Sequence, residues 1–512
     1  MNEPIADNPA GKPWTKRPRW KLRAVCFALV VFAILSVYLW ISLPTAIVIS
    51  RETTWLTEPL TADGQYVDFP RALHEKFPAM RGKWEDSPWY LLTYNVPSRP
   101  LTVPYEDPEQ TIEMESTTAL QDYLNQRSAY PFSEDDDPVL AGIISENEPW
   151  YAAALAMKPG PSLMPSNDGS FYSLRVGGGP NDKLIRRFAL RTMLAFGTGD
   201  MDKGFEGLKF QMEVHRHTRQ LPGVLGAYLA LEQEAEMSRQ IWSVALLCPD
   251  LGIRLLEIIA QLPTPEALTI EMVERFDFFE RLIDLHELQE FHRGRPTMLM
   301  YRFFPRDQEN RMQEWARVKM LWKRIDFNEL MRRQNESIEE MKRILRIEDV
   351  SARSRELNDL FHTIDDIETA EDAASLGFAV IGDPTDTISK GMRYHIVGSC
   401  SSVSNKILHA TNRFRLCHLA VRLAAFKDKY KRYPDSLLEV AEMDGVQSAP
   451  SNMTLDVFTG EEFRYASDGE TLRIQSWGPN GVDDTNTMEQ PDWYRVNDDL
   501  IWSSTPGQLL ER

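Results

Sequence analysis

The sequence AVCFALVVFAILSVYLWISL, residues 24–43, decides how the rest of this chain is organised. It is a run of twenty residues without a charged side chain. As an α-helix, which rises about 1.5 Å per residue, the run is long enough to cross the hydrocarbon core of a bilayer, about 30 Å thick. A buried helix of a soluble domain rarely lacks a polar face. The sequence therefore predicts a transmembrane helix over residues 24–43.

The charges around this run predict its orientation. Residues 1–23, a basic tail, carry six basic and two acidic side chains, and the first basic residue after the run is Arg51. Because basic flanks stay in the cytoplasm, we expect a single-pass protein of the cytoplasmic (inner) membrane, with the bulk of the chain extracytoplasmic, in the periplasm. A cleaved signal peptide is the alternative, but its apolar core is usually about 7–15 residues long. The longer run, with bulky Tyr38 and Trp40 near its end, favours an uncleaved signal anchor.

Composition limits the partners and the number of domains. The chain has 512 residues and a net charge of −19. An acidic exterior repels phosphate backbones, and no basic stripe interleaved with aromatic residues is present, so nucleic acid is not expected as a partner. An apolar content of 43% is typical of globular proteins. The residues after the run exceed one ordinary core and indicate two or three domains.

The four cysteines do not form a disulfide framework in the sequence. Cys26 lies in the apolar run, and Cys248, Cys400 and Cys417 are widely spread without a C-x-x-C motif. An extracytoplasmic compartment would permit one disulfide. We expect buried thiols that act as small apolar side chains.

The remainder divides into three predicted regions. Residues 44–180 are proline-rich and irregular, since each proline removes a donor and breaks a helix interior. Residues 181–403 have helical periodicity and are predicted to form a helical bundle or a helical-hairpin array. The expected helices there include residues 223–247, 251–262, 266–291, 307–346 and 350–366.

Residues 404–512 are predicted to form a small C-terminal α+β module. Apolar residues from Ile407 to Ala424 recur at helical spacing and indicate one long amphipathic helix. Two short alternating runs, residues 462–465 and 471–476, flank Asp468-Gly469 and predict an antiparallel hairpin. The whole chain is thus expected to be mainly α-helical, with one N-terminal transmembrane helix.

Two resemblances to known families follow from particular residues. Residues 52–68, ETTWLTEPLTADGQYVD, resemble the juxtamembrane segment of an uncharacterised set of membrane-anchored proteins of planctomycete bacteria. Residues 187–284 are similar to the middle of those proteins. The shared patterns there are Met193-Leu194, Gly199-Asp200 and Glu274-Arg275. This resemblance implies no activity.

Residues 418–484 resemble the globular part of the major pseudopilin of type II secretion. The matching segments are Tyr433-Pro434-Asp435-Ser436-Leu437, Asp456-Val457-Phe458-Thr459-Gly460, Phe463-Arg464-Tyr465, Ile474-Gln475-Ser476-Trp477-Gly478 and Gly481-Val482-Asp483-Asp484. The family holds calcium near its C-terminal loop, which implies Asp483 and Asp484, with Asn480, as calcium ligands here. A pseudopilin's apolar stem runs straight into its globular helix, whereas here it lies far upstream. The resemblance therefore implies a pseudopilin-like module, not a subunit of a pseudopilus.

The remaining candidate residues, mainly histidines, are not expected to come together in one site. His215 and His217 are two residues apart and point about 200° apart on a helix, so we expect His215 at the edge of an apolar stripe and His217 exposed. His286 and His292 are expected on a polar helix face. His409 and His418 are not expected to meet.

Residues 399–402, Ser-Cys-Ser-Ser, are expected to form a loop before the last long helix, without catalysis. No nucleophile, metal or phosphate motif of the chain converges in the sequence, and no catalytic or cofactor-binding residue is predicted. The favoured hypothesis is a membrane-anchored extracytoplasmic interaction or scaffold protein with a protein partner in the envelope. The alternatives are an extracytoplasmic, hydrolase-like enzyme whose site is assembled from distant residues, and an accessory component of a secretion machine.

Overall fold

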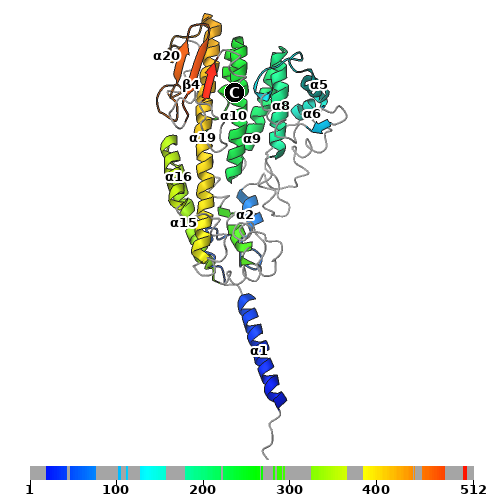
Figure 1. The fold of residues 1–512 in the computed structure, drawn as a ribbon, viewed down its shortest axis with the longest axis vertical. Helices are drawn as coiled ribbons and strands as arrows, with labels where there is room; N and C mark the ends of the chain where they lie inside the picture. Colours follow the sequence, from blue (N-terminus) through cyan, green and yellow to red (C-terminus); the bar gives the residue numbers. More distant parts are fainter. Residues whose placement is uncertain are drawn as a thin grey trace, which may run out of the picture.

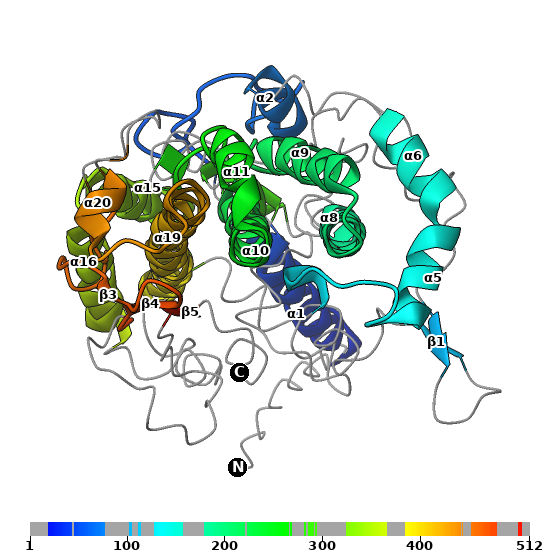
Figure 2. The same ribbon diagram turned by 90° about the horizontal axis from the view of Figure 1, so that it is seen from above.

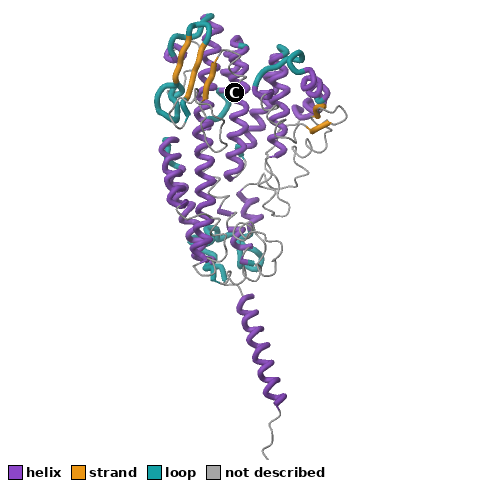
Figure 3. Tube along the Cα trace, viewed as in Figure 1, coloured by secondary structure: helices purple, strands orange, loops and turns teal. Residues whose placement is uncertain are grey.

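The structure is a computed structural model, and it is mainly helical, with a small antiparallel sheet near the C-terminus (Figures 1 and 3). It describes residues 19–42, 46–76, 102–104, 111–113, 127–156, 179–220, 223–265, 267–268, 281–282, 285–290, 292–293, 324–365, 384–441, 443, 452–478 and 500–503. The predicted fold class is confirmed at this level. The predicted helices at residues 266–291 and the first half of 307–346 lie largely outside the described residues.

Helix α1 (Arg19–Ser42) projects from one end of the body (Figure 1). Its described side chains, residues 24–36, are all exposed. Within the part of the chain that the structure describes, no helix has both the length and the apolarity that a membrane crossing needs. The transmembrane helix therefore stays a prediction.

Three antiparallel helices follow one another in the body. They are α8 (Gly179–Gly197), α9 (Met201–Thr218) and α10 (Gly223–Leu247), which contact one another. Gly199 has a φ of 84° in the tight turn between α8 and α9. Asp200 then caps α9, since its carboxylate accepts a hydrogen bond from the Lys203 backbone N–H. The helix predicted over residues 223–247 is confirmed as α10.

The long helix α19 (Pro384–Tyr430) is the central element of the body. Seen from above, it lies between α10 and α11 (Gly252–Ile259) on one side and α15 (Phe327–Leu345), α16 (Val350–Asp365) and the sheet on the other (Figure 2).

The prediction of a loop over residues 399–402 is wrong, because α19 already begins at Pro384. Val397, Cys400, Val403 and Ile407 are buried at a spacing of three or four residues, so the apolar stripe continues upstream of the predicted start. Helix α19 also crosses the predicted boundary between residues 403 and 404, and the division into domains stays a prediction.

Two faces of α19 are buried against different partners. Phe414, Cys417, Val421 and Ala424 join the core formed with α8, α9, α10 and α11. Leu416, Leu419, Ala420 and Leu423 pack under the C-terminal sheet. Gly252 allows α11 to approach this helix closely, because a Cβ atom there would lie only 2.5 Å from the Ala425 backbone nitrogen.

Helix α15 begins later than the sequence indicates. The Asp326 carboxylate caps it by accepting hydrogen bonds from the backbone N–H groups of Asn328 and Glu329, at 3.0 and 3.1 Å. A capping residue starts a helix, so the single helix predicted over residues 307–346 is wrong. The shorter helices are α2 (Phe69–Lys76), α5 (Pro138–Glu146), α6 (Glu148–Ala156), the 3₁₀ turn η4 (Pro249–Leu251) and α20 (Leu437–Ala441).

The C-terminal sheet has the order β3 (Arg464–Ser467), β4 (Leu472–Ser476) and β5 (Leu500–Ser503), with all pairs antiparallel. The predicted hairpin is confirmed as β3 and β4. Its turn contains Gly469 at a φ of 86°, and the Asp468 carboxylate accepts hydrogen bonds from the backbone of Glu470 and Thr471. A second hairpin, β1 (Thr102–Pro104) with β2 (Thr111–Glu113), lies in the proline-rich region.

Candidate functional site

The predicted calcium ligands cannot be placed. Asn480, Asp483 and Asp484 lie outside the described residues, so the calcium site stays a prediction. Among the residues that the structure does describe, no group of three or more His, Cys, Asp or Glu side chains could hold a metal ion.

The structure separates His215 from His217 but buries both more than expected. His215 is 1% exposed, and its Nε2 lies 3.8 Å from Oε2 of the buried Glu234 on α10. Burial, with the nearby positive charge of Arg219, lowers the pKa of His215 to about 3. The His217 side chain is 13% exposed and contacts Glu213, so the prediction of an exposed His217 is wrong. The neutral His215 has the character of a core residue.

Two of the cysteines, Cys400 and Cys417, behave as packing residues. All four are free, and Cys400 and Cys417 are fully buried. Burial raises the pKa of the Cys417 thiol, and its Sγ donates a weak hydrogen bond to the Ser238 carbonyl at 3.5 Å. A nucleophilic cysteine needs the opposite shift, toward the thiolate. This confirms buried thiols at Cys400 and Cys417.

His409 and His418 both lie on α19, and their rings contact different aromatic side chains. The His409 ring lies edge-on to Phe458 at 4.9 Å between centroids, and the His418 ring lies 4.6 Å from that of Phe414. Burial, with the positive charge of Arg422, lowers the pKa of His418 to about 4.

The structure brings together a site that the sequence did not reveal. Residues 46–68, which we call the N-terminal strap, lie at the end of the body nearest α1 (Figure 1). The Val48 backbone N–H donates to Asn328 Oδ1 at 2.9 Å. Asn335 Nδ2 donates to the backbone carbonyls of Glu52 and Thr53, both at 3.0 Å. Both asparagines belong to α15, so one helix holds the strap at two points.

The far end of the strap contacts the predicted polar histidines. The Tyr66 hydroxyl forms a 3.0 Å hydrogen bond with His292 Nδ1, and His292 is 3% exposed. His286 stacks on Phe69, with 4.3 Å between ring centroids. The Arg293 guanidinium lies 3.9 Å from the centre of the Tyr66 ring. The helix face that carries His286 and His292 is therefore covered in part, by Phe69 of α2 and Tyr66 of the strap.

Apolar side chains hold the same junction. Val67 of the strap and three residues of α2 enter a core with three leucines between positions 282 and 288, with α15 and with the start of α19. Its buried members are Val67, Phe69, Ala72, Leu73, Leu282, Leu285, Leu288, Ile325, Phe327, Leu330, Met331, Ile388 and Met392. Burial of one such side chain stabilises by about 1.5–3 kcal/mol. The strap is thus tied to the body through Val67 at its C-terminal end, with Ile47, Leu56 and Leu60 partly buried against the same core.

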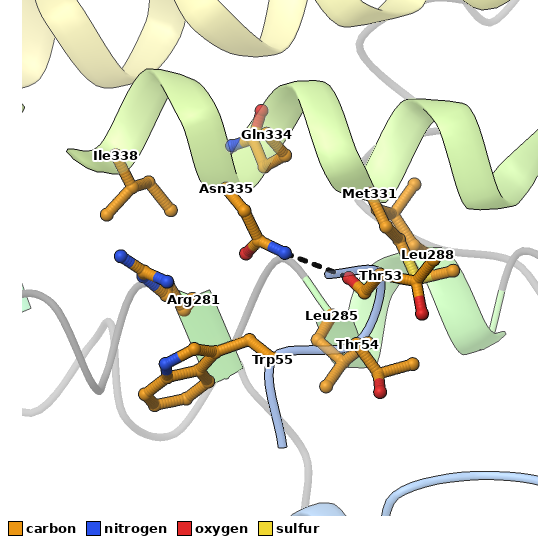
Figure 4. A pocket seen from close by; sticks show the side chains of 10 residues that line it. All are labelled: Thr53, Thr54, Trp55, Arg281, Leu285, Leu288, Met331, Gln334, Asn335 and Ile338. Atoms are coloured by element: carbon orange, nitrogen blue, oxygen red, sulfur yellow. Dashed lines mark hydrogen bonds between the residues drawn. The ribbon is translucent and has the colours of Figure 1, made fainter. Parts of the chain in front are cut away.

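A small cavity lies beneath the strap (Figure 4). Its lining residues are Thr53, Thr54, Trp55, Arg281, Leu285, Leu288, Met331, Gln334, Asn335 and Ile338. Its volume of about 10 Å³ has room for a single water molecule. Arg281 lies 5.2 Å from the centre of the Trp55 ring and pairs with Glu339. The cavity is therefore part of a packed junction and does not have the size of a ligand site.

No sequence signal identifies the strap as a docking element. The residues of α15 that bind it are about 280 positions away in the chain. The only hint is the resemblance of residues 52–68 to a juxtamembrane segment.

Comparison of the chain with protein-family models, with curated proteins and with solved structures found no match. Both family resemblances stay predictions.

Proposed function

We propose that the chain is a membrane-anchored interaction protein: α1 crosses the cytoplasmic membrane, and the extracytoplasmic body binds a protein partner of the envelope. The observation that carries the anchor is the exposure of α1. Phe27 and Phe32 are 72% and 70% exposed, and other large apolar side chains of the helix are exposed as well. Contiguous apolar surface of this kind marks contact with lipid or protein.

Lipid is the better partner for α1 because of its flanks. The apolar run continues to residue 43, and six basic side chains precede it. This is the pattern of a span with a cytoplasmic N-terminus. The strap begins four residues after α1 ends. An anchor joined to the body through the strap, which Asn328 and Asn335 hold, would keep this end of the body close to the bilayer.

The binding role draws support from the body. The buried His215, Cys400 and Cys417 serve packing, and the acidic residues of the chain outnumber the basic ones, 76 to 57. Complementary charge steers protein association. We therefore propose that the partner presents a basic face.

The anchor is tested with the full chain carrying a C-terminal periplasm-dependent reporter. Val30→Asp with Ile34→Asp places two carboxylates at mid-helix, at a cost of about 5–7 kcal/mol for insertion. We expect the double variant to lose reporter activity and resistance to carbonate extraction. The matched control is Val48→Asp with Val139→Asp; Val30 and Val48 are both 56% exposed, and Val139 is 48% exposed. A wild-type fusion whose periplasm-dependent reporter stays inactive would overturn the anchor.

The interaction is tested by cross-linking in intact membranes, followed by purification of the full chain. We expect the same envelope protein in independent repeats and its loss at high salt, since rim charges are screened. Repeats without any common cross-linked protein would contradict the interaction role while leaving the anchor intact.

A further inference from the structure

We propose that a hollow at the C-terminal end of α9 binds a small oxyanion through the guanidinium groups of Arg216 and Arg219. The hollow has a volume of about 250 Å³. Its lining residues are Met212, Arg216, Arg219, Gln220, Gln261, Leu262 and Pro263. They come from α9, the turn after it, and the segment that follows α11.

The lining has the chemistry of an anion site. It combines two arginines with two amide side chains, and none of the described residues that line it is acidic. Arginine presents a planar fork of donors that matches carboxylate and phosphate oxygens. Met212, Leu262 and Pro263 supply apolar walls, which lower the local polarity and strengthen such contacts. Two arginines thus line one hollow in a chain with a net charge of −19.

Arg219 is held in place before any ligand arrives. It is 5% exposed, and its Nη1 donates to the carbonyl oxygens of Pro263 and Thr264 at 3.3 and 3.4 Å. These contacts fix the guanidinium at the edge of the hollow, so little side-chain entropy is lost on binding. Arg216 is more exposed and pairs with Glu213 on the outer surface of α9.

The positive charges of Arg216 and Arg219 both affect the same histidine. Both contribute, after burial, to the lowered pKa of His215, which directly precedes Arg216 on α9. Basic residues in the last turn of a helix are also stabilised by its dipole. That effect accounts for their position in the chain but not for the hollow they line. Lining residues and volume together favour a ligand of the size of a phosphate or a small carboxylic acid, below the usual range of larger ligand pockets.

The test is calorimetric titration of the purified full chain in detergent micelles, with inorganic phosphate and, separately, with succinate. We expect saturable binding of at least one anion at one site. Phosphate alone would identify a phosphoryl ligand, and succinate alone would identify a carboxylate ligand. Arg216→Gln should weaken binding at least about tenfold, since it removes a charged hydrogen-bond donor. Gln261→Glu should abolish binding, because it places a carboxylate in the hollow.

Each control makes the same kind of substitution at a position outside the hollow. Arg239→Gln removes an arginine that is similarly exposed and similarly paired, three residues from Glu236 on α10. Gln65→Glu adds one negative charge on the exposed strap. Both should bind like the wild type. The proposal is overturned if neither anion binds saturably, or if Arg216→Gln binds as tightly as Arg239→Gln.

Discussion

Asn412 should be the residue that ties the C-terminal sheet to the central helix. It is fully buried in α19. Its Nδ2 donates to Ser476 Oγ on β4 at 2.7 Å, and its Oδ1 accepts from the Val457 backbone N–H at 3.1 Å. One amide thus holds a strand and the loop that precedes the sheet. We predict that Asn412→Leu destabilises this contact without changing the volume of the side chain much.

The size of the destabilisation follows from the two hydrogen-bonding groups that lose Asn412 as their partner. The Val457 N–H would become a buried donor without its partner, at a cost of about 1–3 kcal/mol. Ser476 Oγ keeps a hydrogen bond from the Gly478 N–H at 3.3 Å, so its loss is the smaller one, about 1 kcal/mol. The sum is about 2–4 kcal/mol. At about 1.4 kcal/mol per factor of ten, local opening should rise by roughly 30- to 1,000-fold.

The assay is hydrogen exchange of the full chain, read by mass spectrometry on peptides that cover residues 452–460. The matched control is Asn405→Leu, the same substitution on the same helix. Asn405 is half-buried and accepts a hydrogen bond from Ser354, on α16. Exchange in residues 452–460 should rise in Asn412→Leu and stay at the wild-type rate in Asn405→Leu. Equal exchange in the two variants would refute the reasoning.

Three further predictions concern packing, pH and the strap. Gly252→Ala should lower the thermal stability by about 1–3 kcal/mol, since its Cβ would meet the backbone of α19. The control, Gly142→Ala in α5, has no atom within 4 Å of the added Cβ and should raise the stability by about 0.5–1 kcal/mol. Stability changes of the same sign in both variants would contradict the close approach of α11 to α19. Stability to urea should fall as the pH is lowered from 7.5 to 5.5. The folded-state pKa values of His215 and His418 are lowered to about 3 and about 4, so in this range the unfolded chain binds protons at these histidines and the folded chain does not. Each histidine contributes up to about 1.4 kcal/mol over this range, and a His418→Asn variant with an undiminished pH slope would argue against its share. Asn335→Leu should speed proteolysis within residues 46–68, since it removes two hydrogen bonds to the strap backbone; unchanged cleavage would show that the apolar core alone holds the strap.

Elements with strong local signals were predicted well. Residues 223–247 were expected as one helix and form α10 with these bounds. The β3–β4 hairpin follows from Asp468-Gly469, because a glycine at positive φ and an aspartate that accepts backbone hydrogen bonds make a tight turn. These signals lie within a few residues of one another, so a single sequence contains them.

Errors occurred where distant contacts decided the structure. The upstream part of α19 was missed because serines around Cys400 resemble a loop, whereas burial against neighbouring helices keeps them helical. The start of α15 was misplaced because its cap depends on Asp326, inside the predicted helix. The pairing of β5 with β4 was not predicted, since the two strands are separated by residues 477–499.

The sequence by itself determined that the chain is mainly helical, that it begins with a long apolar run behind basic residues, and that its thiols need not pair. These properties depend on periodicity and composition, which are local. Only the tertiary structure decided that the strap docks on α15, that His286 and His292 are covered, and that Arg216 and Arg219 line one hollow. Each of these brings together residues from separate elements, and their proximity comes from helix packing, which no spacing in the chain encodes.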